Sequence, residues 1–164
     1  MNDEVLKGYL QHHWVACTAG VALFRRVGRS FSDAGVAEEV RALGTEAAAD
    51  RESLAALMRS VGVVPTSIGT AAARAGELLG RLKPNGRLVR RSPLTDVVEL
   101  EMLRLSVTSK RAAFEVLRVA ADDDSRLDPY ALDRLVERAD QSLRTLERLH
   151  VSVSRDRMVA GRAV

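Results

Sequence analysis

The stretch that decides the fold is residues 129–158, PYALDRLVERADQSLRTLERLHVSVSRDRM. Its apolar side chains recur at steps of three and four residues, which is the spacing of one face of an α-helix. Asp128 precedes the stretch and Pro129 opens it, and both residue types are typical of a helix start. A long helix with one apolar seam needs partners to bury that seam, so the stretch predicts a helical bundle.

The same spacing divides the rest of the chain. We expect long helices at about 3–28, 33–62, 92–121 and 129–158, and a shorter helix at about 66–82. No stretch shows the alternation of a strand. The sequence therefore predicts one all-α domain over residues 1–164, an antiparallel four-helix bundle with a short extra helix in a long crossover between the second and third long helices.

That crossover, about residues 63–92, is longer than a tight turn requires. It can carry the chain along the bundle, so that the 92–121 helix runs parallel to the 33–62 helix. The alternative is a simple up-and-down bundle with the short helix packed on one end.

Composition limits the class of protein. With 164 residues, 46% of them apolar and only 4% aromatic, the chain can build one core from small and branched aliphatic side chains. A net charge of +3 is too weak to indicate nucleic acid, and the single cysteine excludes an internal disulfide. No signal peptide is visible, and the longest apolar run, VACTAGVALF, is too short to cross a bilayer. We expect a cytoplasmic protein without a membrane partner.

Each predicted long helix carries an apolar seam that contains a strongly polar residue. The seams are Leu6, Leu10, His13, Cys17, Gly20, Phe24 and Val27; Val36, Val40, Leu43, Ala47, Asp50, Leu54, Leu57 and Val61; Leu94, Val98, Glu101, Leu105, Thr108 and Ala112; and Leu132, Val136, Ala139, Leu143, Leu146, His150 and Val153. The polar members are His13, Asp50, Glu101 and His150. A buried charge is costly unless it is paired, hydrogen-bonded or metal-bound, so one polar residue per helix suggests that they meet.

Residue counts from the turns place these residues in two pairs. His13 and Asp50 would agree in height to within about 3 Å at 1.5 Å per residue, and Glu101 and His150 agree as well. Each helical hairpin is therefore predicted to set one histidine opposite one carboxylate.

Three stretches carry a resemblance to a known superfamily: HHWVACTAG at 12–20, EAAADRESLAALM at 46–58 and RLKPNGRLVRRSPLTDVVELEMLRL at 81–105. They resemble uncharacterised actinobacterial proteins of the ferritin-like superfamily, and the likeness covers nearly the whole chain. It implies a ferritin-like bundle and a di-iron pattern of Glu, Glu-x-x-His, Glu and Glu-x-x-His, one element per helix.

The second half of the chain matches this pattern. Glu147 and His150 form the last Glu-x-x-His, and Glu101 or Glu99 supplies the preceding glutamate.

The first half departs from the pattern. Glu46 matches the glutamate of the first Glu-x-x-His, but Ala49 stands where the histidine is expected, with Asp50 beside it. His12 and His13 stand where the first glutamate is expected. Candidate ligands for iron, manganese or zinc are therefore His13, Glu46, Asp50, Glu101, Glu147 and His150.

Three functions remain open from the sequence. The first is a non-catalytic ferritin-like protein with a buried polar or mononuclear metal site, in which His13–Asp50 and Glu101–His150 can also be metal-free pairs. The second is an atypical metal-dependent, di-iron-like oxidoreductase that uses the same candidate ligands.

His12 is expected to be exposed, and Cys17 is expected to be a small core residue.

The third function is a binding module. The segment GRLKPNGRLVRRS at 80–92 contains no acid, and it can bind phosphate, anionic lipid head groups or an acidic partner. The alternative is a solvated loop that pairs with acidic helix ends such as DDD at 122–124. The candidate anion-binding residues are Arg81, Lys83, Arg87, Arg90 and Arg91. No aromatic residue interleaves them, so nucleic acid is not expected. The small-residue stretches ACTAG and EAAAD permit close helix approach, for example in a homodimer.

Overall fold

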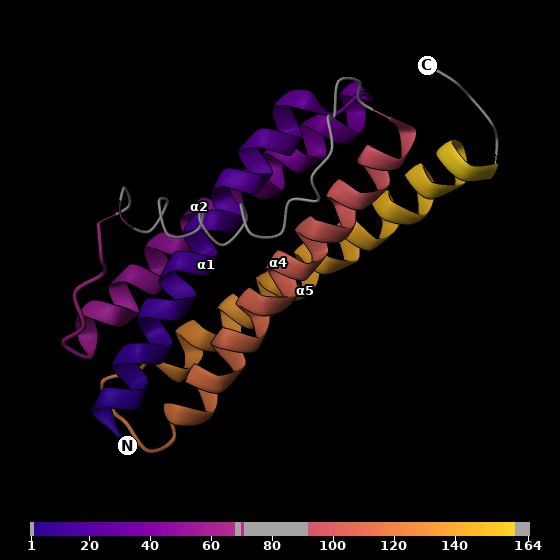
Figure 1. Cartoon of the computed structure of the whole chain (residues 1–164). Helices are drawn as coiled ribbons and strands as arrows, with labels where there is room; N and C mark the ends of the chain where they lie inside the picture. Colours follow the sequence, from indigo (N-terminus) through magenta and orange to yellow (C-terminus); the bar gives the residue numbers. More distant parts are fainter. Residues whose placement is uncertain (1, 68–69, 71–91, 160–164) are drawn as a thin grey trace.

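The all-α prediction is confirmed for the part of the chain that the structure describes. The structure is a computed structural model, and it describes residues 2–67, 70 and 92–159. These residues form four long helices and no strand (Figure 1). The helices are α1 (Asp3–Ser30), α2 (Ala34–Ser60), α4 (Pro93–Ala120) and α5 (Pro129–Ser154), and a π-helical turn, η1 (Arg155–Val159), follows α5. The short helix predicted at 66–82 falls almost entirely outside the described residues.

Local sequence signals set the helix ends. The side chains of Asp33 and Asp128 accept hydrogen bonds from backbone N–H groups of the first turns of α2 and α5. Ser92 and Thr95 hydrogen-bond to each other at the start of α4. Gly62 follows α2 with a φ of +78°, in the left-handed region that glycine adopts without strain. These groups satisfy backbone donors and acceptors that the helices leave unpaired.

The helices form two antiparallel hairpins, α1–α2 and α4–α5, that pack against each other (Figure 1). At one end of the bundle Ser32 hydrogen-bonds to Asp96, and at the other end Arg126 binds Asp3. These contacts make α1 antiparallel to α4, and α2 therefore runs in the same direction as α4. The contact between α2 and α5 is sparse.

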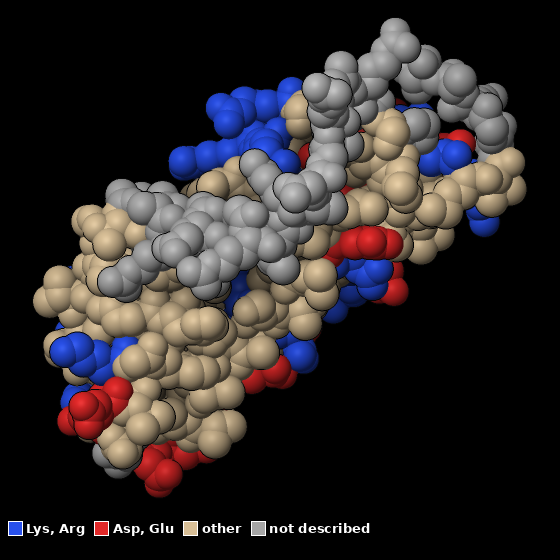
Figure 2. Space-filling view, viewed as in Figure 1, with Lys and Arg blue, Asp and Glu red and all other residues tan. Residues whose placement is uncertain are grey.

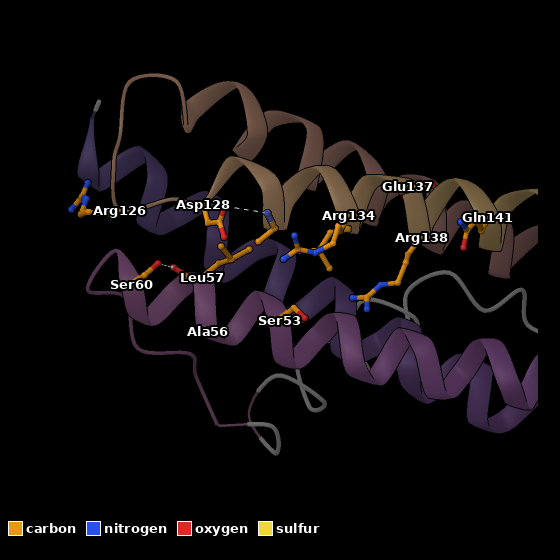
Figure 3. A pocket seen from close by; sticks show the side chains of 12 residues that line it. Ser53, Ala56, Leu57, Ser60, Arg126, Asp128, Arg134, Glu137, Arg138 and Gln141 are labelled. Atoms are coloured by element: carbon orange, nitrogen blue, oxygen red, sulfur yellow. Dashed lines mark hydrogen bonds between the residues drawn. The ribbon is translucent and has the colours of Figure 1, made fainter.

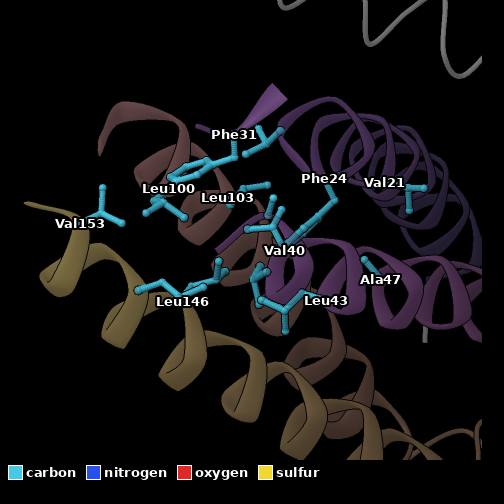
Figure 4. Packing of buried hydrophobic residues seen from close by; sticks show 14 of the residues in the cluster. Val21, Phe24, Phe31, Val40, Leu43, Ala47, Leu100, Leu103, Leu146 and Val153 are labelled. Carbon is cyan, nitrogen blue, oxygen red and sulfur yellow. The ribbon is translucent and has the colours of Figure 1, made fainter. Parts of the chain in front are cut away.

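The hydrophobic core consists of two clusters. The first cluster fills the end of the bundle at which the N-terminus lies. It contains Leu6, Leu10, Trp14, Leu54, Met58, Phe114, Leu117, Leu132 and Leu135, with smaller neighbours. The second fills the opposite end and contains Val21, Phe24, Val40, Leu43, Leu100, Leu103, Leu146 and Val153, with others (Figure 4). Within the described residues, no helix has both the length and the apolar character to cross a membrane.

A polar layer lies between the two clusters. On α2 it is Asp50, between Ala47 of the second cluster and Leu54 of the first. On α4 it is Lys110, which follows Val107 of the second cluster. Both side chains are buried, so the layer interrupts an otherwise apolar core.

The seam predicted for the third long helix was wrong. Leu94, Val98 and Leu105 are 58%, 42% and 64% exposed, so they lie on the outer face of α4. The buried face is a second apolar stripe, Val97, Leu100, Leu103, Val107, Phe114 and Leu117. The helix carries two apolar stripes, and only packing against the other helices decides which one is buried.

Two glycines, Gly20 at the end of the ACTAG stretch and Gly44 on α2, serve the packing of the bundle itself. A Cβ atom on Gly20 would lie 2.7 Å from the Ser106 Oγ atom of α4. A Cβ atom on Gly44 would lie 3.1 Å from the Phe24 Cβ atom of α1. Glycine at these two positions therefore lets neighbouring helices approach closely.

Candidate functional site

The centre of the polar layer is an ion triad built on Asp50. Its side chain is fully buried, and the Lys110 Nζ atom lies 2.5 Å from Oδ2. The Arg138 guanidinium of α5 donates to Oδ1. Three helices thus supply one carboxylate and two cations, and both oxygens of the carboxylate have a cationic partner. We call Asp50, Lys110 and Arg138 the ion triad.

The members of the ion triad differ in their access to solvent. The Lys110 side chain is 8% exposed, whereas the Arg138 side chain is 43% exposed. Arg138 Nε is nevertheless buried and has no hydrogen-bond partner among the described residues. Arg138 therefore connects the buried Asp50 with the surface between α2 and α5.

Cys17 lies beside the ion triad on α1. Burial is the main cause that raises the pKa of its thiol to about 11, and the charges of Lys110, Asp50 and Arg51 act on it with smaller, opposing effects. The thiol is therefore protonated at neutral pH. It packs as a small core residue, as the sequence predicted.

His13 does not pair with Asp50, so this predicted pair was wrong. Its ring is buried, with the centroid 4.5 Å from the Tyr9 ring, and its Nδ1 atom has no hydrogen-bond partner among the described residues. Burial is the main cause that lowers the pKa of His13, and the neighbouring charge of His12 lowers it further. Phe24 lies against Gly44, so the residue level with Asp50 is near Thr18, about 7 Å along α1 from His13.

The second predicted pair, Glu101–His150, does form, but it lies near the surface. His150 Nε2 lies 3.3 Å from Glu101 Oε1, and the Glu101 side chain is 51% exposed. His150 Nδ1 lies 3.3 Å from a guanidinium nitrogen of Arg104. A guanidinium only donates, so Nδ1 of the neutral ring accepts, and Nε2–H donates to the carboxylate.

The remaining candidate ligands do not complete a metal site. Glu46 is exposed and accepts a 3.4 Å hydrogen bond from Ser142, and Glu147 is exposed without a polar partner in the described ranges. Glu101 lies nine residues before Lys110 on α4, so it is about 14 Å along the helix from the ion triad. Among the residues that the structure describes, no group of three or more His, Cys, Asp or Glu could hold a metal ion. The described donors therefore do not fit the di-iron pattern that the resemblance implies.

The predicted anion-binding residues lie outside the described residues. They are Arg81, Lys83, Arg87, Arg90 and Arg91.

The two cationic partners of the buried Asp50 were not predicted from the sequence. Lys110 occupies a core position of the buried α4 stripe, three residues after Val107. It was not predicted as a buried residue because the sequence predicted the other apolar stripe of α4 as the buried one. Arg138 precedes the core residue Ala139 and belongs to a helix rich in surface arginines, so nothing in its position marks it.

A further polar cluster closes the end of the bundle where α1 meets α2. Asp96 is 2% exposed, and its carboxylate lies 2.5 Å from Ser32 Oγ and 3.0 Å from an Arg157 guanidinium nitrogen. Arg157 belongs to η1, so this cluster ties the end of the last helix to the α1–α2 turn and the start of α4.

Comparisons with protein-family models, with curated proteins and with solved structures gave no match for this chain.

Proposed function

We propose that this chain is a non-catalytic, ferritin-like helical-bundle protein that acts by binding. The ion triad carries the proposal. Both oxygens of Asp50, the most deeply buried carboxylate among the described residues, are held by Lys110 and Arg138. The two cations supply the positive charge that a bound metal would otherwise give the carboxylate. The polar core of the bundle is thus structural, and its function lies on its surface.

The directions of the helices support the ferritin-like arrangement. Helices α2 and α4 run in the same direction, which requires a connection that spans the length of the bundle. The first residues of that connection turn back along α1, because Gln11 donates to the Val64 carbonyl and Trp14 Nε1 to the Thr66 carbonyl, at 2.7 and 2.8 Å. The chain therefore leaves α2 toward the far end of the bundle.

Metal analysis tests the proposal. Protein purified without a histidine tag, before and after anaerobic loading with Fe²⁺, Mn²⁺ or Zn²⁺, is measured by elemental analysis. The expected result is far less than one metal ion per chain in either sample. Stoichiometric metal that is lost in Asp50→Asn or in His150→Ala would overturn the proposal and support the metal-dependent oxidoreductase.

An acidic or phosphate-bearing partner for the 80–92 segment stays a prediction. Charge reversal at Arg87, Arg90 and Arg91 tests it, because binding through solvated cations weakens with salt and is lost with the charges. Partner binding that is unchanged by added salt and by the charge reversals would reject this role.

A further inference from the structure

An open groove runs between α2 and α5 beside the ion triad (Figure 3). Its volume is about 640 Å³, within the range of small-molecule sites. It exists because α2 and α5 make sparse contact and because facing residues such as Ser53, Ala56 and Ala131 are too small to fill the space. The largely buried side chains of Leu57 and Leu135 add an apolar lining.

Two arginines give the groove a cationic wall. Figure 3 shows Arg134 and Arg138 projecting from α5 toward α2. Arg138 holds Asp50 through one terminal nitrogen, while its buried Nε–H has no acceptor among the described residues. Arg134 is exposed, and it has no ion-pair partner within the described part of the chain. An unsatisfied donor buried beside an open groove favours a ligand that brings an acceptor.

The net charge of the residues around this wall favours a ligand that carries a single negative charge. Lys110 and Arg138 together exceed the charge of Asp50 by one, and Arg134 adds a second positive charge. Glu137, on the same wall, offsets one of them, and Arg126 and Asp128, at the other end of the groove, carry opposite charges. A planar guanidinium matches a carboxylate through paired N–H donors, and the apolar lining matches an aliphatic body.

From these features we propose that the groove binds an amphiphilic monocarboxylate, with its head at Arg134 and Arg138 and its chain over Leu57 and Leu135. The inference rests on the proposed function in one respect, because Arg138, which would bind the ligand head, is also a member of the ion triad. Metal content and carboxylate binding are separate measurements, so either can fail while the other holds.

Octanoate is the probe, and octan-1-ol is its uncharged match. Titration calorimetry of the full chain is combined with NMR shifts of the leucine methyl groups. We expect one octanoate per chain, shifts at Leu57 and Leu135, and binding of octan-1-ol at least about tenfold weaker because it lacks the charged head.

Three variants locate the site. Ala56→Leu fills the groove from an exposed position that tolerates a larger side chain, and we expect it to abolish binding. Arg134→Gln leaves the ion triad intact, and we expect about tenfold weaker binding. The matched control is Arg148→Gln, on the same helix, whose arginine pairs with Glu39 outside the groove and whose loss should leave binding unchanged.

The proposal is overturned if octanoate fails to bind, or if it binds equally well to Ala56→Leu and Arg134→Gln. It is also overturned if octan-1-ol binds as tightly as octanoate, since the arginine wall would then have no role.

Discussion

At the scale of single residues, Asp50 shows how unevenly a buried ion group responds to change. Removing one cation leaves a carboxylate in the core with incomplete compensation, whereas replacing the group as a whole removes the need for compensation. Which cation is removed also matters. Lys110 is enclosed, but Arg138 reaches solvent and can be hydrated.

We expect Lys110→Met to lower the free energy of unfolding by about 3 kcal/mol, since Asp50 then keeps Arg138 alone. Urea unfolding followed by circular dichroism measures the change. Arg111→Met, on the same helix, is the control. Arg111 pairs with Asp140 at the surface, so its loss should cost less than about 1 kcal/mol. Similar costs for the two variants would contradict a structural role for the ion triad.

Cys17 makes stability depend on alkaline pH. The pKa of its thiol is about 11 in the folded chain and near the ordinary value of 9.0 in the unfolded chain. Between pH 9 and pH 11 the thiol is deprotonated in the unfolded chain but still protonated in the folded chain. The contribution of the thiol to the free energy of unfolding is therefore complete below pH 9 and is lost as the pH rises through 11.

We therefore expect this thiol to reduce the free energy of unfolding by about 2 kcal/mol between pH 9 and pH 11. The measurement is denaturant unfolding across that range for the wild type and for Cys17→Ala. The variant should show the smaller decline, and parallel curves would count against a buried, protonated thiol.

At the scale of the helix, two glycines of α1 show two different effects of glycine on stability, one through backbone entropy and one through packing. Gly8 is exposed, and a Cβ atom there would meet nothing within 4 Å. Gly28 faces α2, where a Cβ atom would lie 2.8 Å from Arg41 Cγ and 3.4 Å from the Arg41 backbone nitrogen.

Gly8→Ala should stabilise the fold by about 0.5–1 kcal/mol, because alanine loses less backbone entropy in a helix. Gly28→Ala should destabilise it by about 1–3 kcal/mol, because the Arg41 side chain or the helix that carries it must shift to admit the methyl group. Thermal unfolding of both variants checks the two signs, and stabilisation by Gly28→Ala would refute the close approach.

Helices and their starts could be predicted because their signals are local. Caps such as Asp33 and Asp128 act on N–H groups of the next few residues, and helical periodicity needs no knowledge of neighbours. The buried face of α4 could not be chosen, because its two apolar stripes satisfy the same spacing. The site was predicted only in part. Glu101 and His150 lie close together, but the partners of Asp50 depend on how α4 and α5 sit against α2.

At the scale of the whole molecule, the outer stripe of α4 exposes apolar side chains toward both ends of the helix, with the exposed polar residues Glu101 and Thr108 among them. Besides its N-terminal half it includes Val116 and Val119, which are 51% and 71% exposed. The face of the molecule that Figure 2 shows carries charged side chains of both signs beside uncharged ones. If two copies pair with their α4 helices antiparallel, Leu94 comes to lie beside Val119 of the second copy, and Val98 beside Val116.

The homodimer predicted from the sequence should therefore form through α4. We expect Leu105→Glu to shift the chain toward monomer in sedimentation equilibrium, because it places a charge at the centre of that stripe. Val5→Glu, at an exposed position on α1, is the matched control and should not change the mass. A wild-type chain that stays monomeric at high concentration would remove the homodimer from consideration.

The polar layer between the two halves of the core has a consequence for how the hairpins align. Apolar layers of Leu, Val and Ala are nearly interchangeable, so a bundle made only of them can slip by one helical turn at small cost. A slip of four residues along α4 would replace Lys110 with Ser106 or Phe114 opposite the Asp50 carboxylate. Neither side chain can neutralise it. The same slip shifts α5 the opposite way along the chain and replaces Arg138 with Arg134 or Ser142, so Asp50 keeps at most one cation. The buried carboxylate therefore favours the one alignment of the two hairpins in which both of its cationic partners are present.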